Sequence, residues 1–255
     1  MTGGKLTIVG LGPGAPELMT PAVAEALRDA TDLVGYDTYL DRVPDTNPAQ
    51  RRHGSGNRVE IDRARHALQL AAEGRNVAVV SGGDPGVFAM AAAIFEAVET
   101  GEESWRRLDI RVEPGVTAVL AAAAAVGAPL GGDFCVMSLS DNLKSWALIA
   151  RRLEAASRGD FVVALYNPTS HARPHQLADA FALLRQWKPA DTVVVFVRAA
   201  GTAEAQVHIS TLADAHTAPA DMRTLVIVGA DATRLIERPY AAPWVYTPRS
   251  ERGAQ

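Results

Sequence analysis

Short β-branched runs that end in glycine, proline, serine or aspartate alternate along this chain with stretches rich in alanine and leucine. Such alternation is typical of βα units, in which each strand leads into a helix that covers the sheet. The runs of the first half are apolar on both faces, as the strands of a covered parallel sheet are. The sequence therefore predicts an α/β protein whose first sheet is mainly parallel.

The expected elements fall into two halves. In the first half we expect strands at residues 6–9, 32–36, 76–80 and 109–112, with helices at residues 21–30, 62–73, 89–100 and 117–126. In the second half we expect strands at residues 134–139, 161–166, 192–197, 206–210 and 224–228, with helices at residues 143–157, 175–187 and 212–216. The strands near Gln206 and Thr224 are separated by too little chain for a long helical crossover, so the second sheet is expected to be mixed in direction.

The best candidate for a domain junction is the segment from Gly127 to Asp133, which is dense in turn-forming residues. A chain of 255 residues is long enough for two compact halves. We therefore predict an N-terminal α/β domain at residues 1–126 and a C-terminal α/β domain at residues 127–255.

Composition narrows the classes of partner. The chain has 25 Lys and Arg against 29 Asp and Glu, a net charge of −4, so no overall field attracts polyanions such as nucleic acid. The single cysteine, Cys135, permits neither an internal disulfide nor a thiolate metal site, which predicts an intracellular protein without a resident metal. The most apolar window, residues 116–126, is far shorter than the ~20 residues that span a bilayer. With no signal-peptide pattern at the start, we expect a cytoplasmic protein.

A glycine-rich turn at residues 10–15 follows the first strand and matches the pattern G-x-G-x-x-A. This pattern on its own suggests a dinucleotide-binding fold, with Asp37 on the ribose. In that fold the turn enters its helix at once, so that main-chain N–H groups face the pyrophosphate. Here the helix begins only near Pro21, and Pro13 and Pro16 remove two donors. An NADP-dependent oxidoreductase and a noncatalytic nucleotide-binding module therefore remain as alternatives only.

Two further turns of the same kind follow later strands, at residues 81–88 and 113–118. Ligands of open α/β sheets bind beyond the carboxyl ends of strands, where glycines let a ligand lie against the main chain. The three turns are expected to converge there. Asp84 is then a candidate to bind ribose hydroxyls or a cation, or else a favourable charge at the start of the next helix. Thr117 is either a ligand contact or a helix N-cap.

In this order and spacing the segments 10–20, 82–85 and 114–118 resemble the tetrapyrrole methylase family, the S-adenosylmethionine-dependent methyltransferases of cobalamin and sirohaem synthesis. The resemblance covers nearly the whole chain. Further segments resemble the ring-contracting branch of that family, which methylates precorrin-3B at carbon 17: residues 34–40, 86–90, 133–141 and 164–168.

The resemblance implies a homodimer that binds S-adenosylmethionine between its two domains, methylates precorrin-3B at carbon 17 and contracts the ring to precorrin-4. A methylase acting on another precorrin carbon is the alternative within the family. The cofactor-binding residues that it implies are Pro13, Gly82, Gly83, Asp84, Val87, Thr117, Ala118, Tyr166, Ala200, Gly201 and Val228. Tyr166 and Val228 have ordinary alternative roles, at a strand end and in the core.

The implied substrate carries several carboxylates, which arginine binds bidentately. Basic residues gather in two predicted loops, and the substrate-binding candidates among and near them are Arg51, Arg52, Arg173 and Asp141. Asp141 is also a candidate cap for the helix near Asn142. His53, Arg58, His171 and His175 lie in the same loops, and solvated surface charges are the alternative reading of both clusters. Relatives often carry histidine where this chain has Gly132, so one of these histidines would supply any role of that imidazole.

Overall fold

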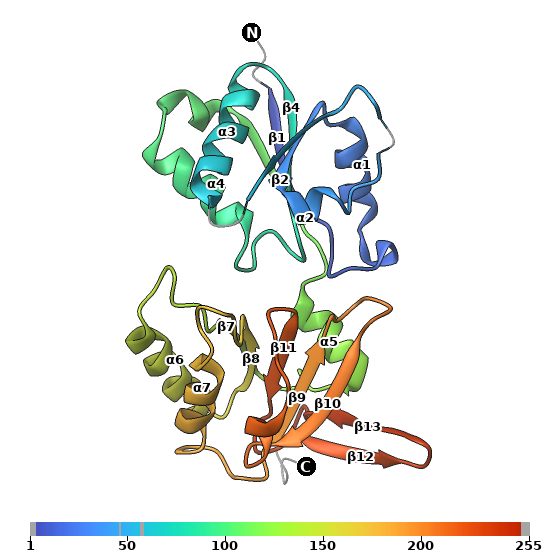
Figure 1. The fold of residues 1–255 in the computed structure, drawn as a ribbon, viewed down its shortest axis with the longest axis vertical. Helices are drawn as coiled ribbons and strands as arrows, with labels where there is room; N and C mark the ends of the chain where they lie inside the picture. The colour runs from blue at the N-terminus through green and yellow to red at the C-terminus, as the bar shows by residue number, and fades with distance from the viewer. Residues whose placement is uncertain (1–3, 46, 57–58, 251–255) are drawn as a thin grey trace. The chain divides into compact units, whose positions relative to one another are not determined.

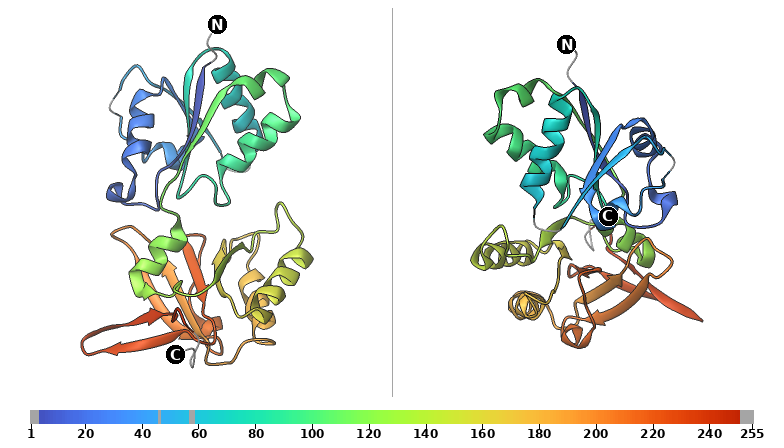
Figure 2. Two further views of the ribbon diagram at one scale, coloured as in Figure 1. Left: turned by 180° about the vertical axis from the view of Figure 1, so that it is seen from behind. Right: turned by 45° about the horizontal axis from the view of Figure 1, so that its top comes forward.

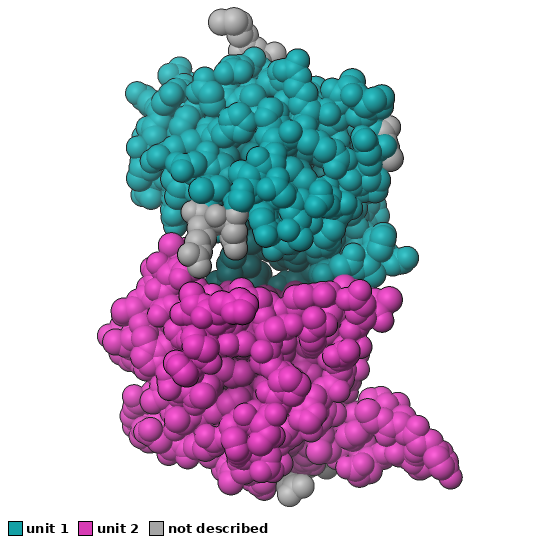
Figure 3. All heavy atoms as spheres, in the orientation of Figure 1, with its two compact units in different colours: residues 1–117 teal, residues 118–255 magenta. Residues whose placement is uncertain are grey.

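The computed structural model describes residues 4–45, 47–56 and 59–250. It divides into two compact units, Met1–Thr117 (unit 1) and Ala118–Gln255 (unit 2), which Figure 3 distinguishes by colour. The predicted boundary after residue 126 lies at the other end of a helix, α5 (Ala118–Val126). That helix contacts strands of unit 2, β11 and β13, which places it with unit 2.

Unit 1 is built on a five-stranded sheet in the order β3-β2-β4-β1-β5, and every neighbouring pair is parallel. The strands are β1 (Lys5–Gly10), β2 (Asp32–Tyr36), β3 (Arg51–Ser55), β4 (Asn76–Ser81) and β5 (Asp109–Glu113). The helices are α1 (Pro21–Asp29), α2 (Asp37–Leu40), α3 (Glu60–Ala72) and α4 (Met90–Thr100), with 3-10 turns η1 (Pro16–Leu18) and η2 (Glu103–Arg107). The predicted mainly parallel first sheet is confirmed.

Alternation along the strands of unit 1 sends successive side chains to opposite faces of the sheet. Val77 and Val79 pack with α3 and α4 on one face, whereas Ala78 and Val80 pack with α1 on the other. Figure 1 shows α1 and the α3–α4 pair on opposite sides of the sheet. Because both faces are covered, the central strands β1, β2 and β4 are largely apolar on both faces, which is the pattern read from the sequence.

Unit 2 has its own five-stranded sheet, in the order β10-β9-β11-β8-β7. Its strands are β7 (Phe134–Ser138), β8 (Val162–Tyr166), β9 (Val193–Arg198), β10 (Gln206–Thr211) and β11 (Thr224–Val228). The pair β7–β8 is parallel and the others are antiparallel, so the predicted mixed sheet is confirmed. Helices α6 (Trp146–Arg158) and α7 (Gln176–Leu184) cover one face, and α5 lies on the other (Figure 2).

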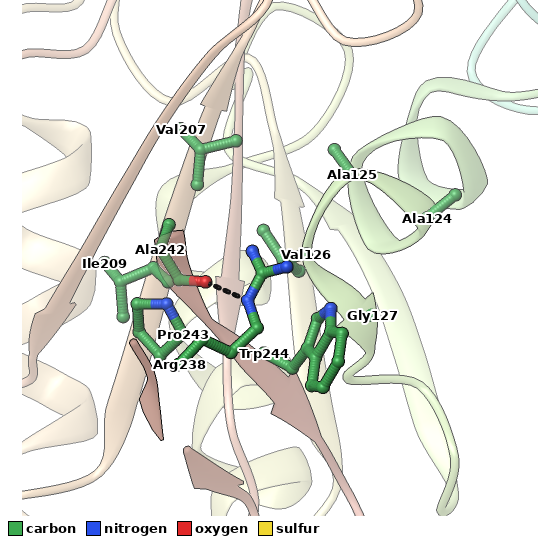
Figure 4. A pocket seen from close by; sticks show the side chains of 10 residues that line it. All are labelled: Ala124, Ala125, Val126, Gly127, Val207, Ile209, Arg238, Ala242, Pro243 and Trp244. Carbon is green, nitrogen blue, oxygen red and sulfur yellow. Dashed lines mark hydrogen bonds between the residues drawn. The ribbon is translucent and has the colours of Figure 1, made fainter. Parts of the chain in front are cut away.

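A third, small sheet in unit 2 was not predicted. It joins β6 (Gly127–Ala128) to the hairpin of β12 (Arg234–Arg238) and β13 (Ala241–Tyr246). A pocket of about 270 Å³ lies among α5, β10 and this hairpin, with the guanidinium of Arg238 stacked 4.6 Å from the centre of the Trp244 ring (Figure 4). None of the predicted site residues lines it.

Three local predictions were wrong. Residues 51–55, expected in a loop, form the edge strand β3 beside β2. Residues 212–216, expected as a helix, contain only the start of a 3-10 turn, η3 (Ala215–Thr217). The cap of α6 is Ser145, whose hydroxyl accepts a hydrogen bond from Leu148 N, so Asp141 does not cap that helix. By contrast, the helix expected from residue 21 is confirmed: α1 begins at Pro21, and its N-cap Thr20 accepts a hydrogen bond from Val23 N.

Candidate functional site

The three glycine-rich turns of unit 1 meet at the carboxyl ends of adjacent strands. Strand β1 lies between β4 and β5, so the turn that follows it lies between the other two. Gly12 N donates to Gly83 O at 3.2 Å, and Gly83 N donates back to Gly12 O at 2.9 Å. Leu11 N also donates to Ser81 O, at 2.9 Å. The predicted convergence is therefore confirmed, and we call residues 10–15, 81–88 and 113–117 the turn platform.

Glycine is required where these turns touch. A Cβ added at Gly10 would lie 2.5 Å from Gly83 O and 2.8 Å from Gly115 N. One added at Gly115 would overlap the carbonyl oxygens of Gly83 and Gly10. Gly12 and Gly83 also have φ values of 74° and 65°, a region that favours glycine. The glycines of the turn platform thus serve first to bring three main-chain segments into contact.

Asp84 ties the second turn to the third. Its Oδ1 accepts from Gly86 N at 2.8 Å and its Oδ2 accepts from Gly115 N at 3.1 Å. A carboxylate offers about four lone-pair sites, so two bonds leave room to accept from a ligand hydroxyl. The reading of Asp84 as a charge at the start of the next helix is not supported by its contacts, because α4 begins at Met90 and Asp84 bonds to loop N–H groups instead.

The same geometry disfavours the dinucleotide alternative. A pyrophosphate cradle needs free main-chain N–H groups at a helix start. The N–H groups of Gly12 and Gly83 are already bonded to each other's carbonyls, and Pro13 and Pro16 have none to offer. The first α-helix begins at Pro21, after a 3-10 turn.

The other predicted cofactor residues of unit 1 border these contacts. Pro13, Gly82, Val87 and Thr117 are all half-buried, so each keeps surface for a ligand while being held by its neighbours. Phe88, next to Val87, has a φ of 54° and is 53% exposed. A strained, exposed aromatic residue beside a predicted binding loop is common at functional sites.

The predicted cofactor residues of unit 2 lie at the start of α5, at the end of β8, in the turn after β9 and on β11. The hydroxyl of Tyr166, at the end of β8, accepts from Val119 N at 2.9 Å and so ties that strand to the start of α5, just after Ala118. Ala200 is buried and Gly201 has a φ of 75°, in the turn after β9. Val228 is 0% exposed within the core, which is its ordinary alternative role.

The basic cluster near residue 51 is mostly engaged within the protein. The two terminal nitrogens of Arg52 donate to Leu40 O and Val43 O, each at 2.9 Å. His53 Nε2 lies 2.8 Å from Oδ1 of the buried Asp32. Arg51 is exposed, and Arg58 lies outside the described residues.

The second cluster leaves more groups available. Arg173 donates weakly to Met222 Sδ at 4.0 Å, and its Nη1 is buried and, within the described chain, has no hydrogen-bond partner. His171 and His175 are exposed on the same loop. Asp141 Oδ2 accepts from Gln176 Nε2 at 3.2 Å and is otherwise exposed. An unpaired guanidinium nitrogen beside exposed polar groups suits a carboxylate ligand.

Position 132 has limited space. A Cβ added at Gly132 would lie 3.1 Å from Thr247 Cγ2, tighter than ordinary contact, so a histidine there requires Thr247 to shift. His53, on strand β3, lies 2.8 Å from the Asp32 carboxylate on strand β2. His171 and His175 therefore remain as the candidates for any role that a histidine at position 132 has in relatives.

Sequence reasoning missed Tyr39 and Arg42, which contact the turn platform from α2 and its end. Arg42 Nη2 donates to Gly12 O at 2.9 Å. A Cβ added at Gly82 would lie 2.7 Å from Tyr39 Cε1. The segment 34–40 was noticed for its resemblance to relatives, but no pattern in it reveals a contact with distant turns.

Within the described ranges, no cluster of three His, Cys, Asp or Glu side chains is placed to hold a metal ion. The same ranges contain no helix with the length and apolar character needed to cross a bilayer.

A comparison with known protein families decides between the remaining readings. The family model of the tetrapyrrole (corrin/porphyrin) methylases matches residues 5–216. The chain belongs to the tetrapyrrole methylase family. One relative in this family, precorrin-3B C(17)-methyltransferase of a Sinorhizobium species, is 52% identical over 98% of both chains.

Solved structures of tetrapyrrole methylases agree with the fold. The crystal structure of the methyltransferase CobJ matches with a TM-score of 0.89 and 50% identity, covering 96% of this chain and 100% of that one. Uroporphyrin-III C-methyltransferase from Thermus thermophilus, solved with S-adenosylhomocysteine, matches with a TM-score of 0.62 at 21% identity over 89% of this chain and 92% of that one. At that identity the likeness shows the fold alone.

Proposed function

We propose that this chain transfers the methyl group of S-adenosylmethionine to carbon 17 of precorrin-3B, with contraction of the ring to precorrin-4. The observation that carries the proposal is the 52% identity, over 98% of both chains, with the relative named precorrin-3B C(17)-methyltransferase. The turn platform supplies the physical part of the argument.

The residues present suit S-adenosylmethionine. Its sulfonium carries an already activated methyl group, so the protein has to align donor and acceptor in a dry site rather than provide a metal or a covalent nucleophile. In unit 1, Asp84 keeps lone pairs for ribose hydroxyls beyond its bonds to Gly86 and Gly115. Pro13, Val87 and Thr117 supply half-buried surface beside it.

The carboxylate arms of the substrate are assigned to unit 2. Arg173 has an unpaired guanidinium nitrogen, and two exposed histidines stand on the same loop. Ring contraction also needs proton transfers. Asp141 is the exposed carboxylate near that loop, whereas the hydroxyl of the buried Ser138 already accepts from Asn167 Nδ2 and Ser140 N.

Calorimetry tests the cofactor class. S-adenosylhomocysteine is expected to bind and NADP is not, because Gly12 N and Gly83 N are bonded within the turns and Pro13 and Pro16 offer no N–H to a pyrophosphate. Binding of NADP without binding of S-adenosylhomocysteine would return the oxidoreductase alternative.

Mass spectrometry tests the substrate. Incubation of precorrin-3B with S-adenosylmethionine and the protein is expected to give a product with one added methyl group. Parallel incubations with cobalt-containing substrate and with other precorrins decide the metal content and the carbon. Unchanged precorrin-3B, together with turnover of another precorrin, would reassign the substrate within the family.

We also propose that the protein acts as a homodimer, as the resemblance implies, and that it does so in the cytoplasm, as its cysteine content and the start of its sequence predict. Light scattering of the purified protein checks the oligomeric state. A monomeric mass at the concentrations used for the activity assay would contradict it.

A further inference from the structure

Tyr39, in α2, and Arg42, just after it, both contact the turn platform. We call these two residues the α2 brace. Arg42 Nη2 donates to Gly12 O at 2.9 Å and to Leu11 O at 3.4 Å. The ring of Tyr39 packs directly on Gly82, where an added Cβ would lie 2.7 Å from Cε1 and 2.8 Å from Cζ. Helix α2 and the residues directly after it thus contact the first and the second turn.

The bond to Gly12 O matters because of the residue that follows. Pro13 has no N–H, so the carbonyl is the only polar group of the Gly12–Pro13 peptide. That carbonyl accepts from Gly83 N and from Arg42 Nη2. With its two donors on different elements, the peptide plane is fixed in orientation, and with it the ring of Pro13.

The brace is itself held in place. Arg52, on β3, donates to Leu40 O and Val43 O at the end of α2. Tyr36 packs edge-to-face on Tyr39, with ring centroids 5.5 Å apart. Burial lowers the pKa of Arg42, against a smaller opposing effect of Tyr39, but an arginine stays protonated in proteins. The guanidinium is therefore a permanent donor to two carbonyls.

Resting on the proposed use of S-adenosylmethionine, we propose that Arg42 is a positioning residue for that cofactor: it touches no reacting atom but fixes the Gly12–Pro13 peptide against which the cofactor binds. Loss of the guanidinium lets this peptide turn, although the strands beneath it stay paired. The consequence is weaker cofactor binding without a matching change in affinity for the precorrin.

The test compares Arg42→Ala and Arg42→Lys with Arg28→Ala, whose exposed side chain makes only a 3.9 Å pair with Asp29. Titration with S-adenosylhomocysteine is expected to give a Kd raised about tenfold or more in Arg42→Ala, because the main chain against which the cofactor binds is no longer held in one orientation before binding. Arg42→Lys replaces the guanidinium with a compact ammonium group, and its Kd should lie between those of wild type and Arg42→Ala. Arg28→Ala should match wild type.

Two further readouts separate positioning from loss of fold. The KM for S-adenosylmethionine should rise while the KM for the precorrin stays within about twofold. Added guanidinium at millimolar concentration should restore cofactor affinity to Arg42→Ala and leave Arg28→Ala unchanged. If Arg42→Ala does not fold, the same comparison is made on Arg42→Lys.

Equal affinity of wild type and both Arg42 variants for S-adenosylhomocysteine would overturn this inference alone. A parallel rise of both KM values would also overturn it, because it would indicate a general loss of structure. Failure of the wild type to bind S-adenosylhomocysteine would overturn the proposed function, and this inference with it.

Discussion

Asp84 and Gly115, 31 residues apart in the chain, are joined by a 3.1 Å hydrogen bond from the main-chain N–H of Gly115 to the Asp84 carboxylate. The same carboxylate accepts from Gly86 N. A residue predicted to bind the ligand therefore also links two turns by hydrogen bonds. Its substitution is expected to affect both ligand affinity and stability, and experiments can separate these two effects.

Asp84→Ala is expected to raise the Kd for S-adenosylhomocysteine at least about tenfold and to lower the free energy of unfolding by about 1–3 kcal/mol, since two main-chain N–H groups lose a charged acceptor. Asp84→Asn keeps one acceptor oxygen, so its Kd and its free energy of unfolding should lie between those of wild type and Asp84→Ala. Calorimetry and chemical denaturation measure the two effects. Wild-type affinity in Asp84→Ala would leave Asp84 with its fastening role only.

Gly115→Ala is expected to destabilise unit 1 and abolish cofactor binding. Its Cβ would overlap the carbonyl oxygens of Gly83 and Gly10, and main-chain atoms cannot move aside as a flexible side chain can. Gly56→Ala is the matched control, because a Cβ there meets nothing within 4 Å. Thermal unfolding with and without S-adenosylhomocysteine checks both variants. Equal melting temperatures of the two would contradict the close contact of the turns.

Stability is expected to fall in acid because of Asp32. Burial raises the pKa of its carboxyl, but hydrogen bonds from Arg75, His53 and Thr31 outweigh burial and hold the pKa below its ordinary value of 3.8. A carboxyl with a depressed folded-state pKa stabilises the fold above its unfolded-state pKa, and this stabilisation is lost as the pH falls through the folded-state value. Denaturation curves between neutral pH and pH about 3 should show a smaller loss in Asp32→Asn than in wild type. Parallel curves would contradict it.

Lys188→Met is expected to lower the free energy of unfolding by about 1–3 kcal/mol, the range for a hydrogen bond to a charged group. The side chain of Lys188 is 1% exposed and its Nζ lies 2.9 Å from Asp160 Oδ1. Asp160 is 45% exposed and also accepts from Asp231 N, so the carboxylate left behind remains hydrated. The loss therefore stays below the ~3–5 kcal/mol of breaking a fully buried pair. Cofactor affinity should not change, and a change would place this pair in the site.

Arg173→Ala is expected to raise the KM for the precorrin about tenfold, the effect of losing one charge-assisted hydrogen bond. The affinity for S-adenosylhomocysteine should stay as in wild type. Arg151→Ala, an exposed arginine on α6, is the control. An unchanged KM for the precorrin in Arg173→Ala would remove this residue from the substrate-binding set.

The fold and the turn platform were predictable because their signals are local. Glycines directly after apolar runs, such as Gly10 and Gly82, mark the strand ends at which the turns meet. The strand β3 gave no such signal: its sequence is polar, since it is an edge strand with exposed side chains. The hairpin is hard to predict as well, because proline is uncommon within strands and β13, which pairs with β12 and β6, contains Pro243.

The support beneath the site was not predictable for a different reason. Arg42 donates a hydrogen bond to Gly12 O, and the Asp32 carboxylate pairs with Arg75 and His53. These partners lie so far apart in the sequence that no motif spacing indicates their contact. A single charged residue outside any motif is predicted to be exposed to solvent, because most charged residues are. Only the folded structure shows that it has a buried partner. The same limit applies to Arg52, whose hydrogen bonds to Leu40 O and Val43 O are not indicated by its place in a basic cluster.

The position of β1 has a consequence for how the protein is made. This first strand pairs with β4 and β5, which enter the chain only at residues 76 and 109. During synthesis, the segment around Gly12 can therefore form its contacts only after Gly83 and Gly115 have been made. Contacts between residues so far apart in the sequence form slowly. The contacts of the turn platform thus form only when the sheet of unit 1 is complete. A ligand bound there favours the finished sheet over every partly folded form.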